Sequence, residues 1–249
     1  MWFQFKSYFK FLASASNQHG VHSPFVYNLV TQCFYDTKDK PEYFNITTYR
    51  TRLFKTEGEV TLKEDDQIRK VKISTLAKKN KFSNKKSKLL FRLSEYLSVQ
   101  SVLEFGSSLH LVTASLAANL KTVIQVIEDD HEANRISFQL LKEANFENLP
   151  DTISKLSELP TPHQQQVDLV YVNKLCSKND FNTYFSTLLK LKHNDSVFVF
   201  NNIYHSKENL SMWEEIKNHP EVRVTIDTFL LGLVFFRTEQ AKEHFKIRL

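Results

Sequence analysis

The stretch Ser101–Asp130 reads SVLEFGSSLHLVTASLAANLKTVIQVIEDD and decides the fold that we predict. Its pattern predicts a strand over Ser101–Phe105, a tight turn at Gly106, a helix around Leu109–Leu120 and a second strand over Thr122–Ile127. This order is typical of the first βαβ unit of a nucleotide-type α/β fold. In such folds a cofactor lies at the first turn.

The same rhythm continues to the end of the chain. Further strands are predicted near 152–154 and over 167–172, 196–200, 222–229 and 231–237, with helices between most of them. The last two strands are too close for a parallel crossover, so they must form an antiparallel hairpin that turns near Leu230–Gly232. We therefore predict an α/β fold with a Rossmann-like, doubly wound, mostly parallel seven-stranded sheet. We expect a helical cap or arm over 1–95 and the Rossmann-like domain over 96–249.

The N-terminal region is predicted to be helical in several places. Trp2, Phe5, Phe9 and Leu12 recur at helical spacing, which predicts an amphipathic helix that packs on its own domain or on a second subunit. A membrane-surface role is less favoured because Lys6 and Lys10 are the only basic residues in this helix. We expect no membrane partner, while a homodimer is compatible with the pattern. Further helices are expected at 24–34, capped by Ser23, and at 49–54, 68–76 and 89–97.

Composition favours a globular protein of a reducing compartment. The 249 residues include 4 Gly and 2 Cys, and the two cysteines, Cys33 and Cys176, lie far apart. This spacing argues against a disulfide framework and a structural zinc site, so we expect a cytoplasmic protein. The chain contains no run of about 18 apolar residues, so we predict no transmembrane helix. The first residues lack the continuous apolar core of a signal peptide.

The positive charge is concentrated in one segment. The chain has a formal net charge of +5, and residues 69–92 hold 10 of its 33 Lys and Arg side chains and no acidic one. The remaining residues carry 23 basic and 28 acidic side chains. The segment is interpreted as a solvated connector, with a phosphate-backbone or acidic-substrate contact as the alternative.

Polar residues follow four of the predicted strands. They are Gly106 and Ser107, Glu128 and Asp129, Asn173, and Asn201 and Asn202. The carboxyl ends of parallel strands share one edge of a sheet, so these residues are expected to converge there. A turn and a helix N-terminus hold polar or anionic groups, and Glu128 is suited to accept hydrogen bonds from ribose hydroxyls. A polar rim without a cofactor is the alternative.

A family resemblance agrees with this arrangement. Leu103–Ser108, Thr113 and Leu116–Ala117 resemble the first motif of class I S-adenosylmethionine-dependent methyltransferases, most closely the small-molecule O-methyltransferase branch. Ile127–Glu128, Val167–Asn173, Phe200–Ile203, the C-terminal hairpin and His19–Phe25 are similar to further segments of this family, the last two to a bacterial subgroup. The resemblance implies S-adenosylmethionine as cofactor and a small-molecule acceptor. It implies cofactor contacts from Glu104, Gly106, Ser107, Ser108, Thr113, Glu128, Asp129 and Asn173.

The chain departs from the family at several positions. His110 stands where the family has a second glycine, and an imidazole there would crowd the methionine part of the cofactor. Asn173, Asn201 and Asn202 stand where metal-using members have carboxylates and an amide, and three amides are poor ligands for a hard dication. We therefore predict a metal-independent methyltransferase of unknown acceptor.

The catalytic residue stays open. His205, His110 and His22 are the candidate bases for a hydroxyl nucleophile. Two other functions compete with methyl transfer. The first is a catalytically inactive methyltransferase fold that acts as a binding or scaffold module, and the second is nucleic-acid association through residues 69–92.

Overall fold

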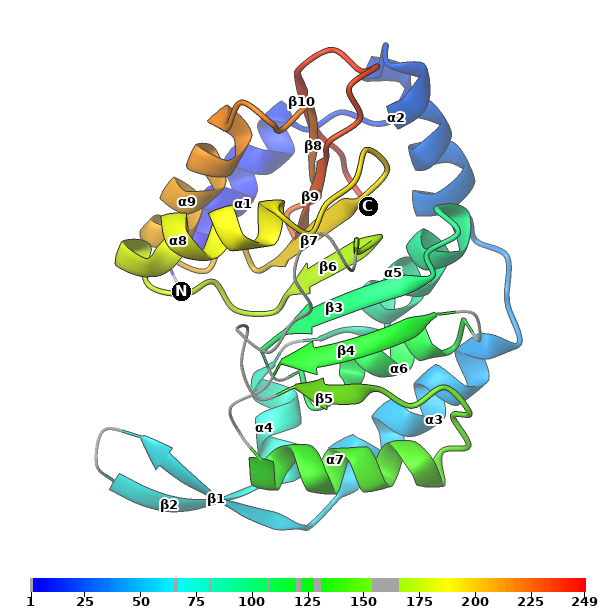
Figure 1. Cartoon of the computed structure of the whole chain (residues 1–249), viewed down its shortest axis with the longest axis vertical. Helices are drawn as coiled ribbons and strands as arrows, with labels where there is room; N and C mark the ends of the chain where they lie inside the picture. The colour runs from blue at the N-terminus through cyan, green and yellow to red at the C-terminus, as the bar shows by residue number, and fades with distance from the viewer. Residues whose placement is uncertain are drawn as a thin grey trace. The chain divides into compact units, whose positions relative to one another are not determined.

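The computed structural model describes residues 2–64, 67–80, 82–106, 108–119, 122–127, 131–153 and 166–249. Contacts divide the chain into two compact units. Unit 1 holds residues 1–36, 101–105 and 160–249, and unit 2 holds residues 37–100 and 106–159. Their elements are shown in Figure 1.

Unit 1 is built on a largely parallel sheet. Its hydrogen-bonded strand order is β10-β8-β9-β7-β6-β3. Strand β9 runs antiparallel to both β7 and β8, and the other neighbours are parallel. The strands are β3 (Ser101–Phe105), β6 (Leu169–Val172), β7 (Val197–Asn201), β8 (Val224–Asp227), β9 (Leu231–Phe235) and β10 (Glu243–Lys246).

Helices cover both faces of this sheet. Trp213 packs on one face, where a Cβ added to Gly232 of β9 would lie 2.7 Å from its ring. Phe235 lies three residues after Gly232 on β9, so it points to the other face, where its ring meets that of Phe25 with centroids 5.1 Å apart. The helices of unit 1 are α1 (Trp2–Ser14), α2 (Pro24–Leu29, continued as a π-helical turn over Val30–Phe34), α8 (Lys178–Leu189) and α9 (Lys207–Asn218).

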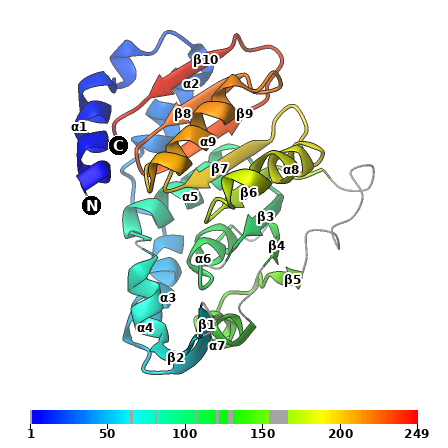
Figure 2. The same ribbon diagram turned by 90° about the vertical axis from the view of Figure 1, so that its left-hand side faces the viewer.

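Unit 2 gathers its helices around α3, which contacts α4, α5, α6 and α7 (Figure 2). Its parallel strand pair is β4 (Val123–Ile127) and β5 (Asp151–Ile153), and its antiparallel hairpin is β1 (Glu59–Glu64) and β2 (Gln67–Lys72). The helices are α3 (Glu42–Lys55), α4 (Ile73–Lys79), α5 (Asn84–Tyr96), α6 (Leu111–Ala117) and α7 (His131–Glu143).

The predicted fold class is confirmed. The chain has a Rossmann-like, mostly parallel α/β architecture with the expected antiparallel C-terminal hairpin, whose turn lies between Asp227 and Leu231. Strand β10 is an addition that the sequence pattern did not indicate. The division of the chain into domains 1–95 and 96–249 stays a prediction.

One local prediction was wrong. The helix expected over 68–76 is a strand up to Lys72 and a helix only from Ile73, because this segment pairs with β1 and the pairing outweighs local helix propensity. Of the two expectations for the aromatic residues of α1, packing on their own domain is not met, and packing on a second subunit stays a prediction. Trp2, Phe5 and Phe9 are exposed, and the buried positions of α1 are Ser7 and Phe11.

Candidate functional site

The turn after β3 depends on the glycine at its start. Gly106 has φ 80°, a left-handed conformation that a residue with a Cβ adopts only with strain. Its N–H donates to the carbonyl of Ile127, the last residue of β4, at 3.0 Å. The turn is therefore fixed to the carboxyl end of β4, with no side chain on the glycine to keep a ligand away from the backbone.

The segment that follows carries buried polar side chains, not exposed ones. Ser108, His110 and Thr113 are 2%, 1% and 0% exposed. Ser108 Oγ accepts the N–H of Val112 at 3.2 Å, which satisfies a free donor at the start of α6. Thr113 Oγ1 lies 3.3 Å from Nδ1 of His110. We call residues 108–113 the turn segment.

Two consecutive residues of the turn segment have a left-handed backbone. Leu109 has φ 52° and His110 has φ 54°, a conformation that costs about 1–2 kcal/mol for each residue with a side chain. A tyrosine of α3 holds this backbone in place. The hydroxyl of Tyr49 contacts the carbonyl of Leu109 at 2.6 Å and that of Ser137, on α7, at 3.2 Å.

The imidazole of His110 is enclosed in unit 2. Its ring packs edge-on against Phe138 of α7, with centroids 5.8 Å apart. Burial lowers the pKa of His110 to about 4, so the ring is neutral at pH 7. Its Nε2 has no hydrogen-bond partner among the residues that the structure describes. As a candidate base, His110 is thus a buried group without solvent access.

Strands β6 and β7 end in two amides that meet. The N–H of Asn173 donates to the carbonyl of Phe105 at 2.9 Å, which joins the end of β6 to the end of β3. Asn201 Nδ2 donates to Asn173 Oδ1 at 3.0 Å. We call Asn173 and Asn201 the amide rim. The structure thus brings these two predicted rim residues together, and their side chains are neutral and already bonded to each other.

Glu104 lies on β3 opposite Tyr171 of β6, and both are fully buried. Burial raises the pKa of Tyr171 well above its usual range, and the negative charge of Glu104 adds to the effect. The Tyr171 hydroxyl has no hydrogen-bond partner in the described part of the chain. Glu104 is therefore an interior group in unit 1.

Three predicted site residues fall outside the described residues, namely Ser107, Glu128 and Asp129. Asn202 is described and has φ 54°, a left-handed backbone that asparagine tolerates. Its carbonyl accepts the N–H of His205 at 2.8 Å.

The other two candidate bases are exposed. Nε2 of Gln4, on α1, lies 3.4 Å from Nδ1 of His205 and 3.3 Å from its carbonyl oxygen. With the amide as donor, Nδ1 accepts and the ring proton of His205 sits on Nε2. His22 lies immediately before Ser23, the N-cap of α2.

Sequence reasoning missed a buried pair at the same edge as Asn201. The hydroxyl of Tyr204 donates to the Asp227 carboxylate, whose other oxygen accepts the N–H of Phe229 at 2.8 Å. Asp227 of β8 pairs with Gly232 of β9, and Asn201 of β7 pairs with Leu231, the residue next to Gly232. Burial raises the pKa of Asp227 and, with the carboxylate, that of Tyr204. The sequence signal that could have indicated this pair is an acidic residue, Asp227, at the end of the β-branched run 224–226.

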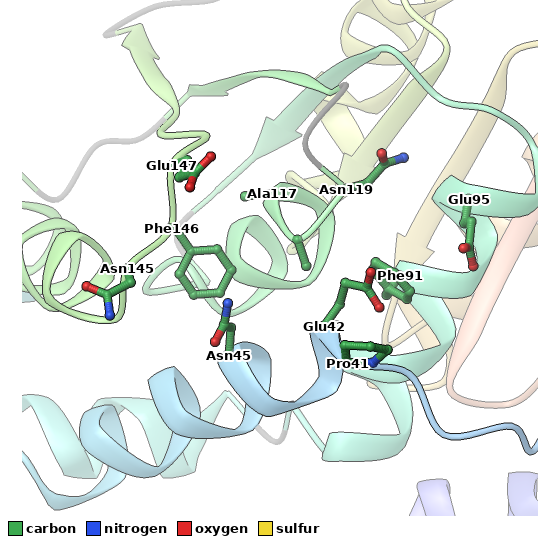
Figure 3. A pocket seen from close by; sticks show the side chains of 11 residues that line it. Pro41, Glu42, Asn45, Phe91, Glu95, Ala117, Asn119, Asn145, Phe146 and Glu147 are labelled. Atoms are coloured by element: carbon green, nitrogen blue, oxygen red, sulfur yellow. The ribbon is translucent and has the colours of Figure 1, made fainter.

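Unit 2 contains a cavity of about 420 Å³, shown in Figure 3. Asn119, which follows α6, and Phe146, which follows α7, line it together with Asn45 and Phe91. Asn119 precedes β4, whereas Gly106 is bonded to the last residue of β4. The cavity therefore belongs to the opposite end of β4 from the glycine turn.

The basic segment 69–92 spans β2, α4 and the start of α5. Lys86 is 2% exposed, and burial lowers its pKa to about 8. Lys88 lies over the ring of Tyr43, 4.4 Å from its centroid. At least these two lysines therefore contribute to packing within unit 2, so the segment is not a uniformly solvated charge run.

In the described ranges, no group of three or more His, Cys, Asp or Glu side chains is placed to hold a metal ion. No helix in the described part of the chain is long and apolar enough to cross a membrane.

Comparison with known proteins gives a consistent fold. No protein-family model matches the chain, and no curated protein is significantly similar to it in sequence. A methyltransferase of Podospora anserina with bound SAH has a TM-score of 0.58 at 10% identity, over 87% of this chain and 97% of that one. The O-methyltransferase TomG of Streptomyces achromogenes, in complex with SAM, has a TM-score of 0.54 at 18% identity, over 89% and 99%.

A third structure, the O-methyltransferase of Bacillus cereus with SAH, has a TM-score of 0.52 at 13% identity, over 81% of this chain and 93% of that one. These similarities extend over most of each chain. The chain therefore has the fold of class I methyltransferases, as the sequence motifs predicted.

Proposed function

We propose that this protein is an S-adenosylmethionine-dependent methyltransferase that acts on a small molecule without a divalent metal ion. The observation that carries the proposal is the left-handed Gly106 turn, which follows β3 and is fixed to the end of β4, in a chain with this fold. S-adenosylmethionine supplies an electrophilic methyl group on a sulfonium. The residues of this chain would bind it, orient the acceptor and take up the acceptor's proton.

The described residues fit such a ligand. Gly106 offers backbone without a Cβ, which permits close approach of a ligand to the turn. Asn173 offers an amide that can exchange its bond to Asn201 for a bond to a ligand carboxylate or hydroxyl. Glu128, which follows Ile127 in the sequence, is the proposed partner of the ribose, in line with the acid of dinucleotide sites.

Metal independence rests on the chemistry of the amide rim. Hard dications such as Mg²⁺ and Ca²⁺ prefer anionic oxygen ligands, and the rim offers two neutral amides that bond to each other. A base for the acceptor is then needed from the protein. His205 is the favoured one, because it is exposed and follows the end of β7. Gln4 would have to release Nδ1 for the ring to accept a proton there.

Calorimetric titration tests the proposal. Purified protein in EDTA is titrated with S-adenosylmethionine and with S-adenosylhomocysteine, and binding of both is expected. The Gly106→Ala variant should bind neither ligand well. Gly58→Ala is the matched control, because a Cβ at Gly58 meets Thr56 only at the ordinary contact distance of 3.5 Å. Absence of binding by well-folded wild-type protein contradicts the proposal.

A second candidate is a methyltransferase fold that binds its cofactor but does not transfer methyl groups. The observation that favours it is the loss of charge at the amide rim together with the enclosure of His110. The two candidates differ in turnover. Transfer of a labelled methyl group to any component of a small-molecule extract in EDTA supports the enzyme. Tight cofactor binding without transfer supports the binding module.

A further inference from the structure

The first helix presents aromatic side chains to solvent. On α1, Trp2 is 68% exposed, and Phe5 and Phe9 are each 55% exposed. They are three and four residues apart, so they lie on one side of the helix. The rings of Trp2 and Phe5 stack at 6.0 Å, and those of Phe5 and Phe9 meet edge-on at 4.8 Å. We call these three residues the aromatic stripe.

The opposite side of α1 anchors the helix to unit 1. Phe11 is 3% exposed, and its ring lies 5.6 Å from Phe229 and 6.4 Å from Tyr204. Tyr8 also packs edge-on against Phe229 at 4.8 Å. The helix is therefore held in place without the aromatic stripe, which its own unit leaves uncovered.

The surroundings of the aromatic stripe carry positive charge. Lys6 and Lys10 come directly after the stripe residues Phe5 and Phe9 in the sequence. The Nζ atom of Lys6 lies 5.0 Å from the centroid of the Trp2 ring. At the end of α1, Lys246 Nζ donates to Ser14 Oγ at 3.1 Å and Arg248 Nη2 donates to the carbonyl of Leu12 at 2.7 Å. Residues 1–35 contain no Asp or Glu.

We propose that α1 lies flat on an anionic lipid surface, with the aromatic stripe inserted at the level of the lipid headgroups. Helices with Trp and Phe on one side and Lys beside them bind in this way, and the lysines are attracted to lipid phosphates. The amino-acid pattern alone disfavoured a membrane surface because it placed only Lys6 and Lys10 there. The structure adds Arg248 at the carboxyl end of the same helix.

A second copy of the chain fits this surface less well. Two α1 helices packed stripe to stripe would bring Lys6 and Lys10 of each copy close to those of the other. With no acidic residue in 1–35 to pair with them, the like charges would repel. Charge complementarity therefore favours an anionic surface as the occupant.

The two tryptophans of the chain allow a direct test. Trp2 is 68% exposed and Trp213 is 1% exposed, so a change in solvent contact on binding is reported by Trp2. The full chain is titrated with vesicles of phosphatidylcholine containing phosphatidylglycerol, and with vesicles of pure phosphatidylcholine. We expect a blue shift of the emission and co-sedimentation with the anionic vesicles only. The Trp2→Phe variant should co-sediment without the shift.

Two variants and a control separate the contributions. Phe5→Gln with Phe9→Gln should abolish co-sedimentation, and Lys6→Gln with Lys10→Gln should weaken it tenfold or more. Phe44→Gln is the matched control, because Phe44 is 75% exposed but lies on α3 in unit 2, and its binding should equal that of the wild type. Equal binding to both vesicle types overturns the proposal. A second outcome also overturns it: the wild type binds neither vesicle type, and light scattering shows a dimer that the Phe5→Gln, Phe9→Gln variant disrupts.

Discussion

The turn segment and the amide rim both carry polar side chains beside the ends of parallel strands, but they use them differently. In the turn segment of unit 2, Ser108 and Thr113 are buried, Ser108 holds the backbone at the start of α6, and Thr113 contacts the ring of His110. At the amide rim of unit 1, Asn201 and Asn173 hold each other. The polar atoms of the turn segment bond within that segment, whereas those of the amide rim join the ends of two neighbouring strands.

The turn segment places a strained backbone next to Gly106 and stabilises it through Tyr49, which is what a preformed ligand site requires. The amide rim has hydrogen-bonding capacity but no negative charge. The two regions should therefore respond differently to pH, to added charge and to single substitutions.

The largest effect is expected from the pH dependence of His110. Its pKa is about 4 in the folded protein and 6.5 as the ordinary value, so the unfolded chain binds the proton more tightly. The stability that the neutral ring contributes is complete above pH 6.5 and is lost as the pH falls toward 4. The loss amounts to about 3 kcal/mol, because one pKa unit corresponds to about 1.4 kcal/mol.

Urea unfolding at pH 7 and pH 4.5 measures this loss. The His110→Asn variant is the control, because asparagine tolerates the left-handed backbone and does not titrate. The wild type should lose more stability than the variant over this interval. Equal losses would mean that His110 is solvated and would contradict the enclosure of its ring.

A smaller effect is expected when charge is introduced at the amide rim. Replacing both Asn173 and Asn201 by aspartate removes their hydrogen bond and places two carboxylates side by side, with Asn201 only 2% exposed. We expect a loss of about 2 kcal/mol in EDTA. Millimolar Mg²⁺ should recover part of it, because carboxylates are the ligands that this ion prefers.

Thermal unfolding with EDTA and with Mg²⁺ checks this prediction, with the wild type as the control that Mg²⁺ leaves unchanged. If the double variant is as stable as the wild type in EDTA, the two amides do not depend on each other. The hydrogen bond between Asn173 and Asn201 would then make no contribution to stability.

The glycine turn is expected to respond to a single methyl group. Gly106→Ala forces an alanine into a left-handed backbone at φ 80°, which costs about 1–2 kcal/mol. Gly58→Ala should cost less, because its added Cβ meets no atom closer than 3.5 Å. Denaturant midpoints of both variants make the comparison. A Gly58→Ala variant that is the less stable of the two would contradict it.

The sequence predicted strands β3 to β9, the C-terminal hairpin and the gathering of Asn173 and Asn201, because period and strand order determine them. It could not predict the orientation of His110, since burial of that ring depends on Phe138, 28 positions further along the chain. It also missed the hairpin of β1 and β2, whose pairing is not a local property. The hydrogen-bond partners of the Tyr49 and Tyr204 hydroxyls could not be predicted for the same reason, because they lie far away in the sequence.

The smallest effect is expected from the hydroxyl of Tyr49. Tyr49→Phe keeps the ring in the core but leaves the carbonyls of Leu109 and Ser137 without this donor, at a cost of about 1 kcal/mol. Because the Leu109 carbonyl belongs to the left-handed pair, the variant should also weaken cofactor binding more than its stability loss explains. Tyr43→Phe, in the same helix, is the control, since the Tyr43 hydroxyl contacts Arg92 at 3.3 Å and not the turn segment. Calorimetry on both variants decides whether Tyr49 supports the turn segment or only the core of unit 2.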